Sequence, residues 1–136
     1  MTKPTAVTKT INVTVTPTGG HGPNVQCDIT GSPPDVVNNA VFVPVNTAAT
    51  ICFTLVPGNG VANWKSSGSN GAFCSDLGKC PVTPPPAPGT KQGQFTAQPP
   101  AGNVLQVDVS ASPNRSVAHY RLEFDSGSCD PIIINT

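Results

Sequence analysis

The chain has 136 residues, which is the size of one ordinary domain, so we expect a single domain over residues 1–136. Only 10% of the residues are charged, and seven basic residues balance seven acidic ones. This balance argues against nucleic-acid binding, which needs a basic surface to neutralise phosphates. No apolar run reaches the ~20 residues of a membrane-spanning helix, so we expect no membrane span.

The composition favours strands and turns. Threonine and valine suit a half-buried strand, and the 16 prolines and 13 glycines suit turns between strands. The N-terminus has a lysine but no apolar segment after it, so we expect no classical signal peptide. The protein is then either cytoplasmic, exported by another route, or a mature form.

Alternating apolar and polar residues predict four strands in the first half, at residues 10–16, 24–30, 40–45 and 49–56, with turns at 31–35 and 57–60. The strand at 49–56 is the most apolar, with Ile51, Phe53 and Leu55 on one face and Cys52 on the other. Pro44 lies within the third strand. Because proline donates no ladder hydrogen bond, its presence predicts an edge strand.

The alternation fades between residues 61 and 94. Residues 61–65 suggest a short strand that holds Trp64, and the proline-rich residues 81–89 favour an extended polyproline conformation. Such a long irregular segment is either a surface excursion between two strands or a binding loop. If it binds a ligand, the candidate contact residues are Trp64 and Phe73.

The last third predicts strands at residues 105–111 and 118–124, joined by a turn at 112–116 into a hairpin. In the expected register Val109 lies opposite Tyr120, and Asp108 forms a cross-strand ion pair with Arg121 on the solvent face. A turn at 125–127 and a final strand at 130–134 close the chain. In total, about seven to nine short strands predict an all-β, antiparallel β-sandwich with a long proline-rich loop.

The strand at 117–124, with the turn and last strand after it, resembles the F–G hairpin of bacterial immunoglobulin-like domains. Tyr120 would lie near the tyrosine-corner position, and the spacing from Cys52 to Trp64 is similar to that from strand B to strand C. Leu122 stands where antibody domains carry a cysteine, so the resemblance implies an immunoglobulin-like sandwich without that disulfide.

A second resemblance covers only the last twenty residues or so. The sequence from Tyr120 to Asp125, followed by Cys129-Asp-Pro-Ile-Ile-Ile, is similar to the tail of bacterial inclusion-body proteins of the AidA/PixA type. Those chains also end in an Asp-Pro pair before a short apolar strand. The rest of the chain lacks the aromatic richness of that family, and no functional residue is carried over.

The five cysteines leave several arrangements open. Cys74 and Cys80 are either joined as a small disulfide loop or present as two thiols. Cys27 lies on the apolar face of its strand, which indicates a small buried side chain rather than a nucleophile. Cys52 is open to pairing with Cys27 or with Cys129, because sequence alone does not fix connectivity.

The sequence carries no recognisable catalytic or cofactor motif. A zinc site usually needs two closely spaced Cys/His pairs, and only Cys74 and Cys80 approach one, so we expect no metal. His21 and His119 are the two histidines and are both predicted to be solvated. No phosphate loop or dinucleotide fingerprint is present, so we expect no cofactor.

The leading hypothesis is therefore a non-enzymatic β-sandwich, a bacterial accessory, surface or structural module. It would bind a protein partner or associate with itself through edge strands, namely the final strand and the strand that contains Pro44. One alternative is a carbohydrate- or small-ligand-binding module that uses residues 61–94. The other is a cysteine-dependent enzyme or redox protein.

Overall fold

The computed structural model describes residues 7–21, 24–64, 71–74, 91–92, 95–111, 113, 116–124, 127–129 and 132–135. All regular structure in these ranges is β-strand, which confirms the all-β expectation. Twelve strands occur there instead of seven to nine, because several strands of two or three residues are too short to show alternation. In chain order they are β1 (Val7–His21), β2 (Asn24–Gly31), β3 (Val36–Val37), β4 (Ala40–Val43), β5 (Thr47–Leu55), β6 (Gly71–Cys74), β7 (Lys91–Gln92), β8 (Phe95–Ala97), β9 (Val104–Val109), β10 (Ser116–Phe124), β11 (Gly127–Cys129) and β12 (Ile132–Asn135).

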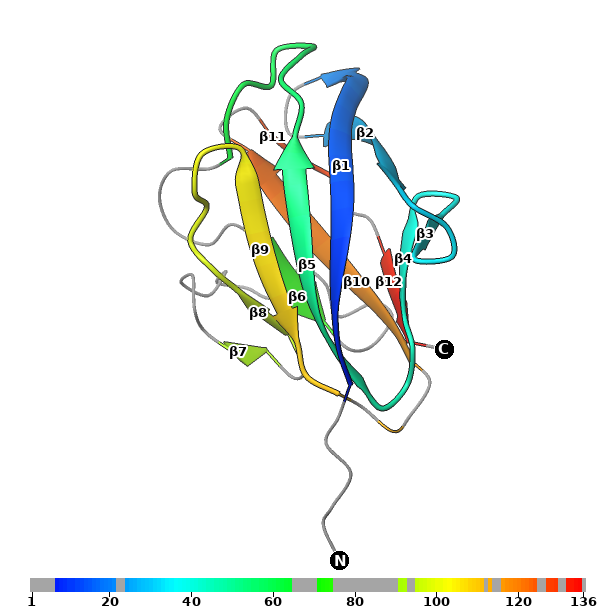
Figure 1. The fold of residues 1–136 in the computed structure, drawn as a ribbon. Helices are drawn as coiled ribbons and strands as arrows, with labels where there is room; N and C mark the ends of the chain where they lie inside the picture. Colours follow the sequence, from blue (N-terminus) through cyan, green and yellow to red (C-terminus); the bar gives the residue numbers. More distant parts are fainter. Residues whose placement is uncertain are drawn as a thin grey trace, which may run out of the picture.

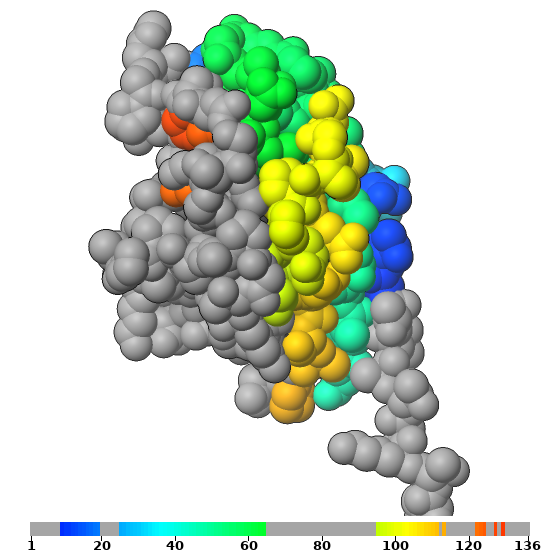
Figure 2. Space-filling view, turned by 90° about the vertical axis from the view of Figure 1, so that its left-hand side faces the viewer, coloured from blue at the N-terminus to red at the C-terminus, as the bar shows by residue number. Residues whose placement is uncertain are grey.

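The strands form two layers. Hydrogen-bonded neighbours follow the order β3-β4-β12-β10-β11-β2-β1-β5-β9-β8-β7, and β6 lies beside β10. Figure 1 shows β1, β5 and β9 in a front layer, with β6, β10 and β12 behind them. In a view turned by 90°, residues 95–111 run as a band along the side of the molecule, next to β5 (Figure 2).

The pairing is mixed rather than purely antiparallel. The β1–β5, β11–β2 and β12–β4 pairs are parallel, and the other pairs are antiparallel. Parallel neighbours need a crossover between them. The crossover between β1 and β5 contains β2, β3 and β4, so the chain leaves the front layer and returns to it.

The core lies between the layers and is built from the predicted alternation. Register aligns the apolar rows, since Ile51 pairs with Ile11 on one side and with Val107 on the other. A shift by one residue would turn every apolar side chain of a strand toward solvent, so this register is strongly specified. The apolar residues of β1, β5 and β9 that the alternation placed inward are buried, as expected: Ile11, Val13, Val15, Ile51, Phe53, Leu55, Leu105, Val107 and Val109.

Both strands that the sequence suggested as edges are internal. β4 lies between β3 and β12, and β12 lies between β4 and β10. Pro44 follows the last residue of β4, Val43, so its missing N–H breaks no ladder hydrogen bond. Within the part of the chain that the structure describes, the outer strands are β3, β7 and β6 instead.

The predicted hairpin between residues 105–111 and 118–124 is wrong. β9 pairs with β5 and β8, and β10 pairs with β6, β11 and β12. Asp108 therefore does not face Arg121 across a strand pair; its carboxylate accepts hydrogen bonds from Thr50 Oγ1 (3.4 Å), Gln98 Nε2 (2.9 Å) and Gln106 Nε2 (2.9 Å). Alternation shows that both strands turn an apolar face to the core. It does not show whether they pair in one layer or lie in opposite layers.

After β10 the chain returns as β11 and β12, so a last strand is present, at Ile132–Asn135 rather than at 130–134, and Gly127 of the predicted turn lies in β11. Residues 125, 126, 130 and 131 lie outside the described ranges. β11 and β12 both pair antiparallel with β10, through Leu122 with Cys129 and His119 with Ile132, in one continuous register. The suggested short strand at 61–65 is not formed in the described residues. There Trp64 makes an isolated bridge with Phe124. The proline-rich residues 81–89 lie outside the described ranges.

Candidate functional site

Trp64, the predicted ligand contact, belongs to the core. Its side chain is 3% exposed, and its ring stacks on Phe124 with a centroid distance of 5.1 Å. The indole Nε1–H donates a hydrogen bond of 2.7 Å to the carbonyl of Asn103. Both the ring and its polar atom are thus engaged inside the protein, so the indole offers no surface for a sugar to stack on.

The other predicted site residues are described only in part. Phe73 and Cys74 are placed by their backbone on β6, opposite Tyr120 and His119 of β10. Their side chains, and the whole of Cys80, lie outside the described residues. The Cys74–Cys80 disulfide and the ligand role of Phe73 therefore stay predictions.

Among the described residues, no three His, Cys, Asp or Glu side chains gather closely enough to hold a metal ion. The same part of the chain contains no helix of the length and hydropathy that crossing a membrane requires. The side chains of His21 and His119, which the sequence predicts to be solvated, lie outside the described residues.

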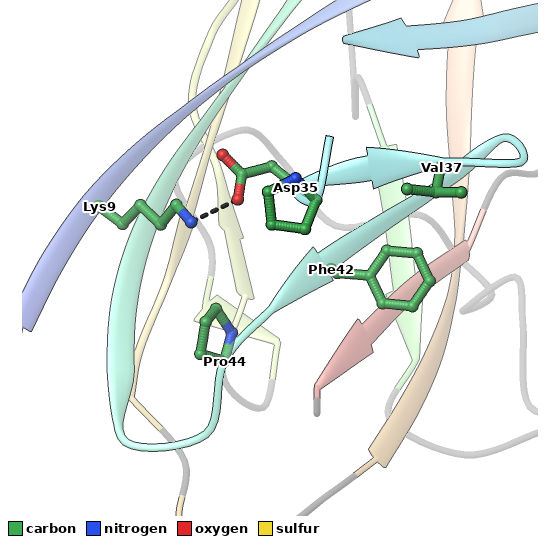
Figure 3. Close-up of a pocket in the computed structure, with 6 residues that line it drawn as sticks. Lys9, Asp35, Val37, Phe42 and Pro44 are labelled. Atoms are coloured by element: carbon green, nitrogen blue, oxygen red, sulfur yellow. Dashed lines mark ion pairs between the residues drawn. The ribbon is translucent and has the colours of Figure 1, made fainter. Parts of the chain in front are cut away.

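A hollow lies on the outer face of the β3–β4 hairpin, among the residues that the structure describes. It has a volume of about 360 Å³. We call it the β3–β4 hollow. Figure 3 shows Lys9 and Asp35 pointing toward each other on one side of it, with Val37 and Phe42 on the other. The lining residues are Lys9, Pro34, Asp35, Val37, Phe42 and Pro44.

Strand alternation creates this hollow. In β3 and β4 the side chains of Val36, Val41 and Val43 are buried in the core. Because successive side chains of a strand point to opposite faces, Val37 and Phe42 must point outward. The hairpin is thus apolar on both faces, which is unusual for a strand pair whose outer face meets water.

A two-asparagine turn fixes the hairpin in place. Asn38 and Asn39 have φ angles of 51° and 63°, the left-handed conformation that a two-residue type I′ turn needs at both positions. Asn39 Oδ1 also accepts a hydrogen bond of 2.9 Å from the N–H of Ile29 in β2. The turn therefore sets the hairpin and ties it to the neighbouring strand.

One ion pair borders the hollow. Lys9 of β1 bonds to Asp35, with side chains that are 34% and 21% exposed. Since the two charges compensate each other, the rest of the hollow presents a neutral, apolar lining. A partly exposed pair of this kind contributes little to stability, so its main effect is on the character of the surface.

The outer edge of β3 is poorly suited to adding another strand. The N–H of Val36 donates to the carbonyl of Ser32 (3.2 Å), and the carbonyl of Asp35 accepts from Phe42 (2.7 Å). The Asp35–Phe42 bond continues the ladder between β3 and β4, whereas the bond to Ser32 occupies the outward N–H of Val36, a main-chain group that a partner strand would need. Recognition at this edge would therefore rely on side chains in the hollow rather than on a β-ladder.

The structure also brings together two thiols that the sequence analysis did not pair. The side chains of Cys27 in β2 and Cys129 in β11 are hydrogen-bonded, and this bond lowers the pKa of Cys27 although burial and the nearby Asp28 both oppose the shift. Cys52 points away from the core on β5, opposite Asn12 and Gln106. The open pairing of Cys52 with Cys27 or Cys129 is thus not what the fold provides.

Comparison with known proteins gives no family. No protein-family model matches the chain, and no curated protein matches it significantly.

Proposed function

We propose that this protein is a non-enzymatic, immunoglobulin-like β-sandwich, of the bacterial accessory or surface kind. We propose further that it acts as an interaction module and holds an apolar side chain of a protein partner in the β3–β4 hollow. The two layers, and the return of β10 as β11 and β12, support the choice of fold class.

The observation that carries the functional proposal is the apolar lining of the hollow. Val37 and Val56 are the two large apolar side chains that are clearly exposed in the described residues, at 38% and 43%. Val37 lines the hollow beside Phe42 and Pro44. Single exposed apolar residues are common, whereas an exposed valine grouped with other apolar side chains around a hollow supports the proposal of an interaction site here.

The size of the hollow favours a side chain over a cofactor. Its volume of about 360 Å³ lies at the lower end of the range of ~300–1,000 Å³ for small-molecule sites. One or two apolar side chains from an extended segment fit such a space. The compensated Lys9–Asp35 pair gives no net charge for an ionic ligand. A neutral, apolar peptide segment is therefore the partner chemistry that this lining suits best.

The test compares two valines with similar exposure. Peptides enriched from a random display library on the wild-type protein are titrated against Val37→Asp and Val56→Asp. A buried charge in the hollow is expected to weaken binding about tenfold or more, whereas Val56→Asp, outside the hollow, leaves the affinity unchanged. Equal affinities for the two variants would contradict the proposal. So would a wild-type protein that enriches no peptide and sediments as a strict monomer.

A further inference from the structure

Cys27 and Cys129 meet where the two layers join. Cys129 is 8% exposed and belongs to the core cluster, and Cys27 packs against that cluster while half-buried. Ser128 of β11 pairs in parallel with Asn24 of β2, so the residues that follow them, Cys129 and Val25, face the same side of the sheet, and Cys27 lies two residues beyond Val25 on that side. The hydrogen bond between the Cys27 and Cys129 side chains agrees with this placement. The two residues are 102 positions apart in the chain, which no local sequence pattern would connect.

The junction between β2 and β11 is the narrowest in the strand order. On one side of this junction lie β3, β4, β12, β10 and β11, and on the other lie β2, β1, β5, β9, β8 and β7. The two groups of strands are joined in the sheet order only through the β11–β2 pair. In the described residues the pairing there consists of Ser128 with Asn24 alone. A covalent link next to it would join the first hairpin of the chain to the last.

We propose that Cys27 and Cys129 form a redox-active dithiol, and that a small-molecule disulfide oxidises it to a disulfide that fastens β2 to β11. The dithiol does not depend on the proposed function, because it lies at the interior junction rather than in the β3–β4 hollow. Both thiols belong to residues that the structure describes, and neither forms a disulfide there.

The chemistry proceeds by two thiol–disulfide exchanges. The more accessible Cys27 thiolate attacks one sulfur of the oxidant, forms a mixed disulfide and releases the first small thiolate. Cys129 then loses its proton and attacks the Cys27 sulfur, which releases the second small thiolate. Two protein thiols and one small disulfide become one protein disulfide and two small thiols, so atoms and electrons balance.

The order of attack follows from access and acidity. Cys27 is half-buried, and Cys129 is almost fully buried. The hydrogen bond from Cys129 lowers the pKa of Cys27 and so raises the fraction of reactive thiolate at neutral pH. Cys129 is placed to resolve the mixed disulfide rather than to start the reaction.

The experiment uses oxidised glutathione and peptide mapping of the folded chain. A tryptic peptide covering residues 10–65 contains both Cys27 and Cys52, and residues 122–136 contain Cys129. Cys52→Ser therefore removes the ambiguity. After equilibration with oxidised glutathione, trapping of remaining thiols and digestion without reductant, we expect these two peptides to be linked in wild type and in Cys52→Ser.

Two further variants separate the roles of the two thiols. Cys129→Ala should accumulate glutathione on Cys27, because the resolving thiol is gone, and Cys27→Ala should show no linked peptide. The proposal is overturned if both thiols remain available for alkylation after treatment. It is also overturned if Cys129 is linked to Cys52, Cys74 or Cys80, or if the link disappears in Cys52→Ser.

Discussion

Replacement of Trp64 tests whether its indole is part of the core or a ligand platform. Trp64→Ala removes a ring that is 3% exposed and stacked on Phe124, so it leaves a cavity. Loss of a buried tryptophan costs about 3–5 kcal/mol of the free energy of unfolding. An exposed platform residue would cost close to nothing when truncated.

Trp64→Phe is the milder companion. It keeps an aromatic ring against Phe124 but loses the Nε1–H bond to the Asn103 carbonyl. That carbonyl also accepts a hydrogen bond of 2.8 Å from the N–H of Leu55, so it is not left without a donor. We therefore expect a loss of about 1 kcal/mol, the usual net contribution of one hydrogen bond, together with a smaller packing loss.

Urea unfolding followed by far-UV circular dichroism measures both variants, because they lack the tryptophan that fluorescence would report on. Trp64→Phe covers the case in which Trp64→Ala does not fold. In the wild type, acrylamide quenching of Trp64, the single tryptophan, should be weak and its emission blue-shifted. A loss below ~1 kcal/mol for Trp64→Ala, or strong quenching in the wild type, would refute the burial argument.

Three further predictions concern the turn and the thiol pair. Asn39→Gly should cost about 1 kcal/mol more in urea unfolding than Asn38→Gly, since both glycines accept the positive φ but only Asn39 bonds to Ile29; equal losses would contradict this. In a variant that keeps only Cys27 and Cys129, oxidation should raise the free energy of unfolding by up to about 4–5 kcal/mol, which is the value for a disulfide that closes a loop of ~100 residues. An oxidised form no more stable than the reduced form would contradict the proposed disulfide. Cys129→Ala removes the hydrogen bond that lowers the pKa of Cys27, so alkylation of Cys27 by iodoacetamide should reach its half-maximal rate at higher pH in that variant; an unchanged or lower pH would contradict the assignment.

The sequence predicted correctly which face of a strand is buried, because that face follows from the local alternation of apolar and polar residues. Alternation at Ile51, Phe53 and Leu55 placed the most apolar strand and its inner face, because a strand between core and solvent has a period of two. It also placed Cys52 on the opposite face. These features depend on near neighbours in the chain.

Which strands pair with each other could not be predicted from the alternation of apolar and polar residues. Residues 105–111 and 118–124 both show an inner apolar face, and that is equally true of strands that pair and of strands that face each other across the core. The Asp108–Arg121 pair was wrong for this reason. Pro44 suggested an edge, although it stands just beyond β4, where a missing donor has no consequence.

The candidate sites were missed because long-range contacts create them. Residues of β1, the turn before β3, β3 itself, β4 and Pro44 after it form the β3–β4 hollow. The outward apolar pair Val37 and Phe42 was the available signal in the sequence. The Cys27–Cys129 contact joins the two ends of the chain and had no signal beyond the apolar face of Cys27.

The most direct test of the proposed function is where a bound peptide touches the protein. An enriched peptide is titrated into ¹⁵N-labelled protein, and backbone amide shifts are recorded for every assigned residue. The account predicts that the largest shifts fall on the hairpin from Asp35 to Phe42 and on Lys9, with none around Val56. Shifts gathered in residues 61–94, with the hairpin unchanged, would contradict it and favour the ligand-binding alternative.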